Sequence, residues 1–331
     1  MNRYDRQEKF KKIGRDGQSF LRAKTVGIIG MGALGTHTAG TLVRAGVNKL
    51  VIIDRDYVEL SNLQRQTLFT EHDAIAAVPK VIAAKKQLMQ INSDVTIEAH
   101  IGHCDAAALR DYFVSCDVLI DGTDNFETRQ LLNDFSYTTT IPWIYGACVE
   151  ATYTACTFIP GNTPCFNCAL GDLPVMNRTC DTVGIIEPAV SMAASIQSVY
   201  ALKILTEEKF EPKLIYGDSW NIEQTALKFS RSKKSDCPTC GQHATFPYLK
   251  DNHHETMLCG RDTVQFKQAP FDAASIETFL EERQINYQRT PYFIRFVFNG
   301  KPFVLFAGGR LLIHEVSSIN EAKTVYHQLF G

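Results

Sequence analysis

The sequence lacks any long apolar run, any excess of one charge and any internal repeat. Its 331 residues include 34 lysines and arginines and 36 aspartates and glutamates, a formal net charge of −2. No stretch approaches the roughly 20 apolar residues of a membrane-spanning helix, and the basic N-terminus has no apolar core of a secretion signal. No net basic field attracts nucleic acid or an anionic membrane. We therefore expect a cytoplasmic protein that binds neither.

The ten cysteines do not indicate a disulfide framework, because cytosolic thiols stay reduced and a chain of this length needs no covalent staples. Four of them form two C-x-x-C pairs, Cys165 with Cys168 and Cys237 with Cys240. Four thiolates suit tetrahedral zinc if the fold brings both pairs together. Either pair alone also fits a redox motif, so the residues by themselves leave both interpretations open.

Short apolar strands alternate with helical segments over the first 140 residues. This alternation predicts a parallel sheet with helices on both faces. The expected strands are 25–29, 49–53, 96–100 and 117–120. The first expected helix ends near Ala45, the second follows Pro79, the third passes through Leu109 and Phe113, and the fourth covers 126–137.

The pattern changes after Pro142. Further strands are expected at 143–149, 153–158, 214–216 and 226–229, with an irregular stretch over 160–184 and a small-residue helix over 188–205. A polar run over 231–236 and the second cysteine pair indicate a boundary near residue 250. We expect one domain over 1–250 and a small α/β module over 251–331, with helices 273–283 and 319–330 and strands 292–298, 303–306 and 311–314.

A glycine-rich turn joins the first strand to the first long helix, with glycines at positions Gly30, Gly32 and Gly35. Glycines at this spacing permit a tight turn, close approach of a phosphate, and packing of the helix on the strand. The N–H groups at the helix start favour an anion. Asp54 ends the next strand, where a carboxylate can accept hydrogen bonds from a ribose. A turn without ligand is the less favoured interpretation, and NAD or FAD would fit these features alone.

Charged and amide side chains beyond the second strand favour ATP over a dinucleotide. Asn62, Arg65 and Lys80 bring an amide and two cations to one side of the turn, and a triphosphate needs that compensation more. The segment from Asp121 to Asn125, DGTDN, follows another strand. A carboxylate there can hold Mg²⁺ against phosphates.

Taken together, these motifs resemble the MoeB/ThiF/HesA family, bacterial relatives of the ubiquitin-activating E1 enzymes. The resemblance covers about residues 3 to 245, and the motifs occur in the family's order. The residues that carry it are RYDRQ from Arg3, GMGALG from Gly30, Asp54, SNLQRQ from Ser61, Pro79-Lys80, DGTDN from Asp121, both cysteine pairs and Thr179-Cys180.

The resemblance implies a Rossmann-like E1 adenylation fold, whose mostly parallel sheet continues into antiparallel strands, and a role for each matching residue. It implies that Asp54 holds the ribose of ATP, that Asn62, Arg65 and Lys80 contact phosphates, and that Asp124 binds Mg²⁺ and supports catalysis. The three glycines and Asn125 complete the expected nucleotide site. Arg65, Lys80, Asp124, Cys180 and Arg6 are the expected catalytic residues; Arg6 would reach into the partner subunit of a homodimer. The four paired cysteines are implied to hold structural Zn²⁺.

The implied reaction is adenylation of the C-terminal glycine of a ubiquitin-like sulfur carrier ending in Gly-Gly, with release of pyrophosphate. Two carriers compete, the small subunit of molybdopterin synthase, slightly favoured, and the carrier of thiazole synthesis in the thiamine pathway. Cys180 can form a persulfide or acyl intermediate in some members of the family and is dispensable for adenylation in others. We assign no histidine as a general base.

Three alternatives remain beside this interpretation: an E1-like enzyme that adenylates a small molecule or tRNA, an NAD-dependent oxidoreductase, and a regulatory binding module without catalysis. The segment 255–331 lies outside the resemblance. It contains one cysteine, Cys259, at its start and is short for a rhodanese domain, so we expect a small α/β module that packs on the core or helps to dock the carrier.

Overall fold

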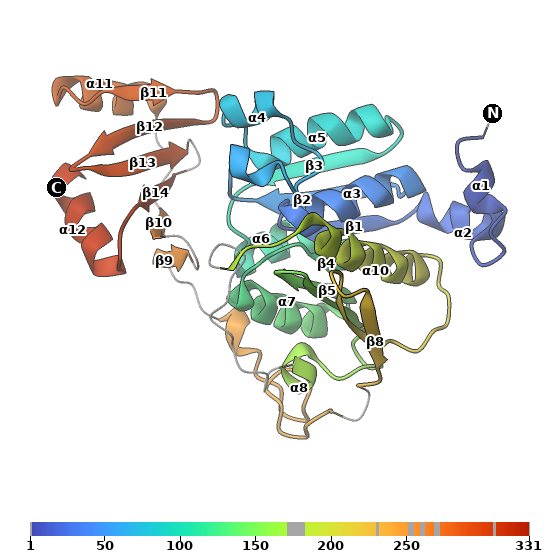
Figure 1. Ribbon diagram of the computed structural model, residues 1–331. Helices are drawn as coiled ribbons and strands as arrows, with labels where there is room; N and C mark the ends of the chain where they lie inside the picture. The colour runs from blue at the N-terminus through green and yellow to red at the C-terminus, as the bar shows by residue number, and fades with distance from the viewer. Residues whose placement is uncertain are drawn as a thin grey trace. The chain divides into compact units, whose positions relative to one another are not determined.

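An eight-stranded sheet forms the centre of the first of two compact units (Figure 1). The computed structural model describes residues 2–170, 183–229, 232–250, 255–258, 262–267, 272–306 and 309–330. The chain divides into Met1–Asp251 and Asn252–Gly331. The strand order in the first sheet is β3-β2-β1-β4-β5-β6-β7-β8.

The first five strands of the chain are parallel. Their bounds are β1 Thr25–Ile29, β2 Lys49–Asp54, β3 Thr96–Ile101, β4 Val118–Asp121 and β5 Trp143–Val149. The central strands are apolar over most of their length because both faces of the sheet are covered. Ile28 and Ile29 illustrate this, since they are both buried and belong to cores on opposite faces.

Helices cover the two faces of this parallel half. Side chains of α3 (Ala33–Ala45), α5 (Lys80–Ile91) and α10 (Glu187–Leu205) join one core, and those of α7 (Phe126–Thr139) join the other (Figure 1). The chain order reverses at β1, which lies between β2 and β4. Ligands bind at such switch points, outside the carboxyl ends of the strands.

The other half of the sheet is antiparallel. It consists of β6 Thr152–Phe158, β7 Leu214–Asp218 and β8 Glu223–Leu227 after β5. The predicted fold class, a mostly parallel sheet continuing into antiparallel strands, is therefore confirmed. Strand β8 forms the edge, and all five of its residues are exposed.

Short elements complete the first unit, and two of them correct the sequence interpretation. They are α1 Asp5–Glu8, α2 Gly14–Leu21, η1 Leu60–Asn62, α4 Glu71–Ile75, α6 Ala106–Ala108, η2 Leu109–Phe113, α8 Phe166–Leu170 and η3 Pro247–Leu249. The expected helix through Leu109 and Phe113 is present, but it is α-helical only over Ala106–Ala108 and continues as a π-helix over Leu109–Phe113. The stretch 160–184, expected to be irregular, contains α8, which begins directly after Cys165 and carries Cys168.

The second unit has its own six-stranded antiparallel sheet, ordered β11-β12-β13-β14-β10-β9, and its own apolar core. The bounds are β9 Glu255–Leu258, β10 Thr263–Lys267, α11 Ala273–Glu282, β11 Tyr287–Arg289, β12 Phe293–Phe298, β13 Lys301–Phe306, β14 Arg310–His314 and α12 Ile319–Phe330. In both units, the described helices are too short or too polar to cross a bilayer.

Candidate nucleotide site and cysteine cluster

The glycine turn is shaped by contacts that exclude side chains at two of its three glycines. Gly30 has φ of 90°, and its N–H donates to the carbonyl of Ile53 at 2.8 Å. A Cβ on Gly35 would lie 1.9 Å from the carbonyl oxygen of Gly30. Gly32 differs, because a Cβ there would have no heavy atom closer than 3.9 Å. The chain itself therefore leaves open space in front of Gly32, as close approach of a phosphate requires.

Asp54 ties the end of β2 to this turn. Its carboxylate accepts from the N–H of Met31 at 2.6 Å and from the N–H of Asp56 at 2.7 Å. Burial raises the pKa of Asp54 above its ordinary value, with Lys80 opposing the shift and Asp56 adding to it. The carboxylate thus lies beside the glycine turn, and its remaining lone pairs can accept from ribose hydroxyls.

Lys80 is buried at the start of α5. Its ammonium group lies 3.5 Å from the Asp56 carboxylate, and its N–H donates to the carbonyl of Asp56 at 2.9 Å. The structure therefore brings Lys80 and Asp54 together at the end of β2. A buried lysine held this way is a fixed positive charge beside the turn.

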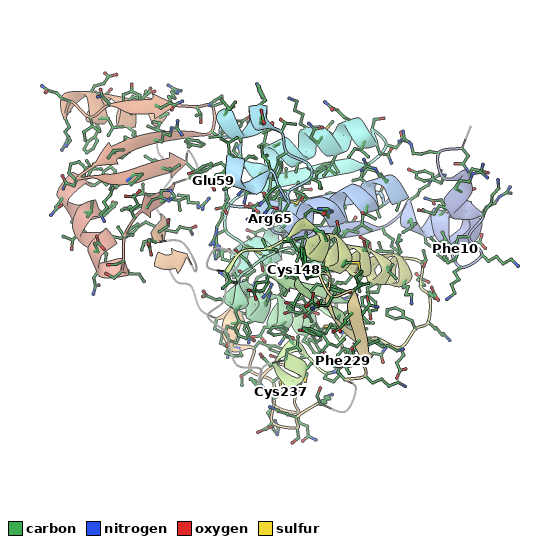
Figure 2. The ribbon with its side chains drawn as sticks, viewed as in Figure 1. Phe10, Glu59, Arg65, Cys148, Phe229 and Cys237 are labelled. Atoms are coloured by element: carbon green, nitrogen blue, oxygen red, sulfur yellow. The ribbon has the colours of Figure 1, made fainter. Side chains whose placement is uncertain are left out.

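The segment SNLQRQ forms η1 and the turn after it. Asn62 is buried, and its side-chain oxygen, Oδ1, accepts from the N–H of Glu59 at 3.2 Å. Arg65 is half-buried and donates to the carbonyl of Ser61 at 2.9 Å; it is labelled in Figure 2. Most of the Arg65 guanidinium therefore remains available to a phosphate.

Gln66 is a candidate that the sequence analysis did not single out. It is buried, and its Nε2 atom is the heavy atom nearest to a Cβ placed on Gly32, at 3.9 Å. Its Oε1 atom has no hydrogen-bond partner among the described residues. A buried amide facing the open side of the turn is suited to contact a ligand there.

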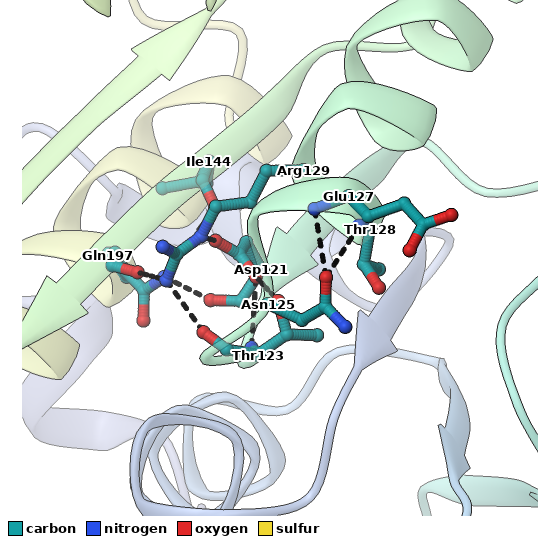
Figure 3. A network of polar contacts seen from close by, with 9 residues as sticks. Asp121, Thr123, Asn125, Glu127, Thr128, Arg129, Ile144 and Gln197 are labelled. Carbon is teal, nitrogen blue, oxygen red and sulfur yellow. Dashed lines mark hydrogen bonds and ion pairs between the residues drawn. The ribbon is translucent and has the colours of Figure 1, made fainter. Parts of the chain in front are cut away.

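The loop between β4 and α7 is built on an internal ion pair (Figure 3). The Asp121 carboxylate is fully buried, accepts from the N–H and hydroxyl of Thr123 at 2.9 and 2.6 Å, and pairs with Arg129 at 2.8 Å. Asp124 is exposed, and its carboxylate interacts electrostatically with Arg129 without a hydrogen bond or ion pair to the described residues. At this end of β4, Asp124 is therefore the carboxylate that can accept a metal ion.

Asn125 caps α7. Its side-chain oxygen, Oδ1, accepts from the N–H groups of Glu127 at 2.8 Å and Thr128 at 3.2 Å (Figure 3). The predicted nucleotide contact of Asn125 can then come only from its amide nitrogen, because the oxygen is used by the helix.

Arg6 lies away from the nucleotide site of its own chain. Its side chain is 90% exposed. Helix α1 is held at the far end of α3, where Gln7 donates to the carbonyl of Ala45 at 2.9 Å. The 13 residues of α3 separate Ala45 from Gly32, roughly 20 Å at 1.5 Å per residue. Cys180, the other expected catalytic residue, lies outside the described residues.

The four paired cysteines converge on one cluster. The Sγ atoms of Cys165 and Cys237 are 3.4 Å apart, those of Cys168 and Cys240 are 3.6 Å apart, and all four lie within 4.8 Å of one another. A zinc ion with Zn–S distances of about 2.3 Å gives sulfur separations of about 3.8 Å, so the donor set fits Zn²⁺. Burial raises the pKa of Cys168 to about 11, and metal binding would displace its proton.

Helix α7 contacts the residues around this cluster through Asp134, more than two turns after the loop that carries Asp124. Asp134 accepts from the hydroxyl of Thr239 at 2.5 Å and from the N–H of Tyr248 at 2.9 Å. The N–H of Thr239 in turn contacts the sulfur of Cys237 at 3.4 Å. Figure 2 shows Cys237 well away from Arg65. The cluster therefore fastens the loops around α7 and takes no direct part in the nucleotide site.

Comparisons with known proteins identify the class. The ThiF family model matches residues 4–239, and the chain belongs to the ThiF family. It is 42% identical to the sulfur carrier protein ThiS adenylyltransferase of Bacillus subtilis over 99% of both chains. It is 32% identical to the molybdopterin-synthase adenylyltransferase of Salmonella typhimurium over 73% of this chain and 97% of that one.

A structure of E. coli MccB with ATP shares the fold. The TM-score is 0.63 at 22% sequence identity, covering 72% of this chain and 74% of MccB. This likeness supports the E1-like adenylation fold of the first unit.

Proposed function

We propose that the chain is an ATP-dependent adenylyltransferase that activates the C-terminal glycine of a ThiS-type sulfur carrier. The observation that carries the proposal is the convergence of groups at the carboxyl ends of β1, β2 and β4. The open glycine turn, the buried Lys80, the half-buried Asp54 and the exposed Asp124 all lie at this edge of the sheet. These groups match the needs of a magnesium-bound triphosphate.

The choice of carrier rests on the extent of similarity. The ThiS adenylyltransferase matches the whole chain, including its second unit. The molybdopterin-synthase relative covers 73% of the chain. We therefore prefer the thiamine branch to the molybdopterin branch that the sequence motifs slightly favoured.

The proposed reaction is an in-line displacement. A carboxylate oxygen of the carrier forms a bond to the α-phosphorus of ATP, the bond from that phosphorus to the bridging oxygen breaks, and pyrophosphate leaves with the electron pair. Asp54 holds the ribose, and Asn62, Arg65 and Lys80 neutralise the phosphates. Asp124 holds Mg²⁺, which supplies further charge neutralisation. Two anions must meet, so positioning and cations supply most of the rate.

We further propose a homodimer in which Arg6 acts in the nucleotide site of the partner subunit. Arg6 is almost fully exposed. Helix α1 is held at the end of α3 that lies roughly 20 Å from Gly32, a distance that follows from the length of α3. A second copy of the chain can bring an arginine to a site that the first copy cannot reach. Reduced thiols in a zinc cluster and the use of ATP fit the cytoplasm.

ATP–pyrophosphate exchange tests the proposal. The purified protein is assayed with a ThiS-type carrier, with a molybdopterin-synthase small subunit, with neither, and with a ThiS-type carrier lacking its last glycine. We expect exchange with the intact ThiS-type carrier and background with the shortened one. Exchange without any carrier would favour adenylation of a small molecule. Exchange only with the molybdopterin-synthase subunit would reverse the choice of branch.

The oxidoreductase alternative fits the site less well. The buried Lys80 and the half-buried Arg65 add positive charge that a dinucleotide requires less than ATP does. The protein can be mixed with NAD and candidate substrates while the absorbance of the nicotinamide is followed. No change in absorbance is expected, and a change would favour the oxidoreductase.

A further inference from the structure

We infer that Arg129 is a positioning residue, which holds the loop between β4 and α7 so that Asp124 faces the nucleotide. The inference rests on the proposed function, because it assigns Asp124 to Mg²⁺. It goes beyond that proposal because the residue that determines the position of Asp124 contacts neither the metal nor ATP.

The guanidinium of Arg129 is used within the protein (Figure 3). Its Nε donates to the Asp121 carboxylate at 2.8 Å, and its Nη2 donates to the carbonyls of Thr123 at 2.7 Å and Gly146 at 3.1 Å. Its carbon lies 5.0 Å from the ring centre of Tyr145. The side chain is 12% exposed. One arginine thus joins α7, the end of β4, the loop after it and β5.

The same loop is pressed from the other side against the glycine turn. The N–H of Gly122 donates to the carbonyl of Ile29 at 2.8 Å, and a Cβ on Gly122 would lie 2.4 Å from the carbonyl oxygen of Gly30. Gln197 of α10 donates to the carbonyl of Asp121 at 2.7 Å. The loop backbone immediately before Asp124 is therefore held by the glycine turn, by Gln197 and by Arg129. Arg129 also connects the loop to β5 through Gly146.

A direct phosphate contact is the competing role for this arginine. Arg65 has one hydrogen bond to a backbone carbonyl and is half-buried, as a ligand-binding arginine requires. Arg129 has three protein acceptors and an aromatic face. Burial lowers the pKa of Arg129, but its interactions with Asp121, Tyr145 and Asp124 together raise that pKa above the ordinary value, so the guanidinium stays charged. Lysine has no planar fork and cannot reproduce this set of contacts.

The test uses Arg129→Lys in the full chain, which keeps a positive charge against Asp121 and so preserves the fold. Arg44→Lys is the matched control, because Arg44 is exposed and makes one bond to the carbonyl of Gly40 at 3.2 Å. Three quantities are measured: the Kd of a nonhydrolysable ATP analogue without metal, the Kd of Mn²⁺ for the analogue complex by electron paramagnetic resonance, and kcat of carrier-dependent exchange.

We expect the metal-free analogue to bind Arg129→Lys within about threefold of wild type, since Lys80, Asp54 and the turn are unchanged. Binding of Mn²⁺ should weaken about tenfold. The kcat should fall about 100-fold, as a misplacement near 1 Å can cause. The Arg44→Lys control should match wild type in all three quantities.

Asp124→Ala and the double variant Asp124→Ala/Arg129→Lys separate positioning from general loss of structure. If Arg129 acts through Asp124, the second substitution should change neither Mn²⁺ binding nor kcat by more than about threefold once Asp124 is gone. Two results would overturn the inference: effects that multiply in the double variant, or an analogue Kd raised tenfold or more without metal.

Failure of the proposed function has a different signature. A wild-type protein without carrier-dependent exchange would refute adenylation of the carrier, while the two Kd values would still test Arg129. A wild-type protein that exchanges normally, with an Arg129→Lys variant unchanged in kcat and Mn²⁺ binding, would refute the role of Arg129 alone.

Discussion

At the scale of single residues, hydrogen bonds divide the polar groups near the nucleotide into those that build the site and those that face the ligand. Asp121, Arg129 and the oxygen of Asn125 are used within the protein. The Oε1 atom of Gln66 has no hydrogen-bond partner among the described residues, and Asp124 is exposed, with an electrostatic interaction with Arg129. Polar groups of the second kind are the ones that a ligand can satisfy.

Asn125 has both roles, and two substitutions separate them. Asn125→Ala should lower the free energy of unfolding by about 1 kcal/mol, because it removes the cap of α7. Asn125→Asp should keep that stability, since a carboxylate also caps a helix, yet weaken ATP binding by losing the amide donor and adding a negative charge. Denaturant titration and ATP-analogue affinity measure the two effects. Equal ATP affinity in Asn125→Asp and wild type would remove Asn125 from the nucleotide site.

Asp54 predicts a pH dependence of ATP binding. Burial raises its pKa above the ordinary 3.8, and only the ionised form can accept from a ribose. ATP affinity should therefore fall as the pH decreases through the raised pKa, before an ordinary aspartate titrates. The folded state also binds this proton more tightly than the unfolded chain, so the contribution of Asp54 to stability decreases as pH rises through that window.

Affinity for the ATP analogue between neutral and acid pH measures this effect, with Asp54→Asn as the control. The variant should bind weakly, and the step due to Asp54 should be missing from its profile. A wild-type affinity that stays constant down to the ordinary aspartate range would contradict the assignment.

At the scale of elements, α7 connects the two functional features of the first unit. Its first turn follows the loop that carries Asp124, and its later residue Asp134 holds Thr239 and Tyr248 beside the cysteine cluster. The cluster therefore stabilises the packing around the helix that supports the nucleotide loop.

Cys237→Ser should release zinc and lower the melting temperature by several degrees, because the metal joins loops far apart in the chain. The loss of adenylation should be indirect: activity should disappear at the temperature at which the variant unfolds. Cys104→Ala is the control, since Cys104 is buried outside the cluster. Metal analysis and thermal unfolding measure the outcome; full zinc content in Cys237→Ser would show that another group completes the site.

Much of the first unit could be predicted because its strands and helices have strong periodic patterns. Strand 25–29 agrees with β1 and strand 143–149 with β5, and in the second unit helix 319–330 agrees with α12. The residues by themselves did not indicate α8 or the π-helix at Leu109, since both depend on tertiary packing that overrides local preference. For the same reason, the three acceptors of Arg129 were not apparent, because they lie on β4, on the loop after it and on β5.

At the scale of the whole molecule, the position of Arg6 makes the proposed dimer part of the active site. Arg6→Ala and Lys80→Ala should each lose carrier-dependent exchange when assayed alone. Coexpressed in equal amounts, they should recover about a quarter of wild-type activity, because about half of the dimers are mixed and each has one intact site.

Lys86→Ala coexpressed with Arg6→Ala is the matched control for expression, since Lys86 is exposed on the same helix as Lys80, and it should give about half of wild-type activity whether or not the subunits mix. Recovery in the first mixture requires the two residues to serve one site from different subunits. Full activity of Arg6→Ala alone, or no recovery in a mixture shown to contain mixed dimers, would refute the exchange of Arg6 between subunits.

The second unit distinguishes this chain from relatives that match 73% of it. It has a separate sheet and core, and the ThiS adenylyltransferase of Bacillus subtilis matches the chain through this unit as well. The proposed carrier assignment rests on the 42% identity to that relative over the whole chain, while the proposed chemistry depends on the first unit.

Intact-mass measurement of the carrier tests the central claim most directly. The protein is incubated with ATP, Mg²⁺, pyrophosphatase and a purified ThiS-type carrier, in parallel with a molybdopterin-synthase small subunit. We predict that the ThiS-type carrier gains the mass of one adenylyl group at its C-terminal glycine. A protein that is folded, binds ATP and leaves both carriers unmodified would contradict the account.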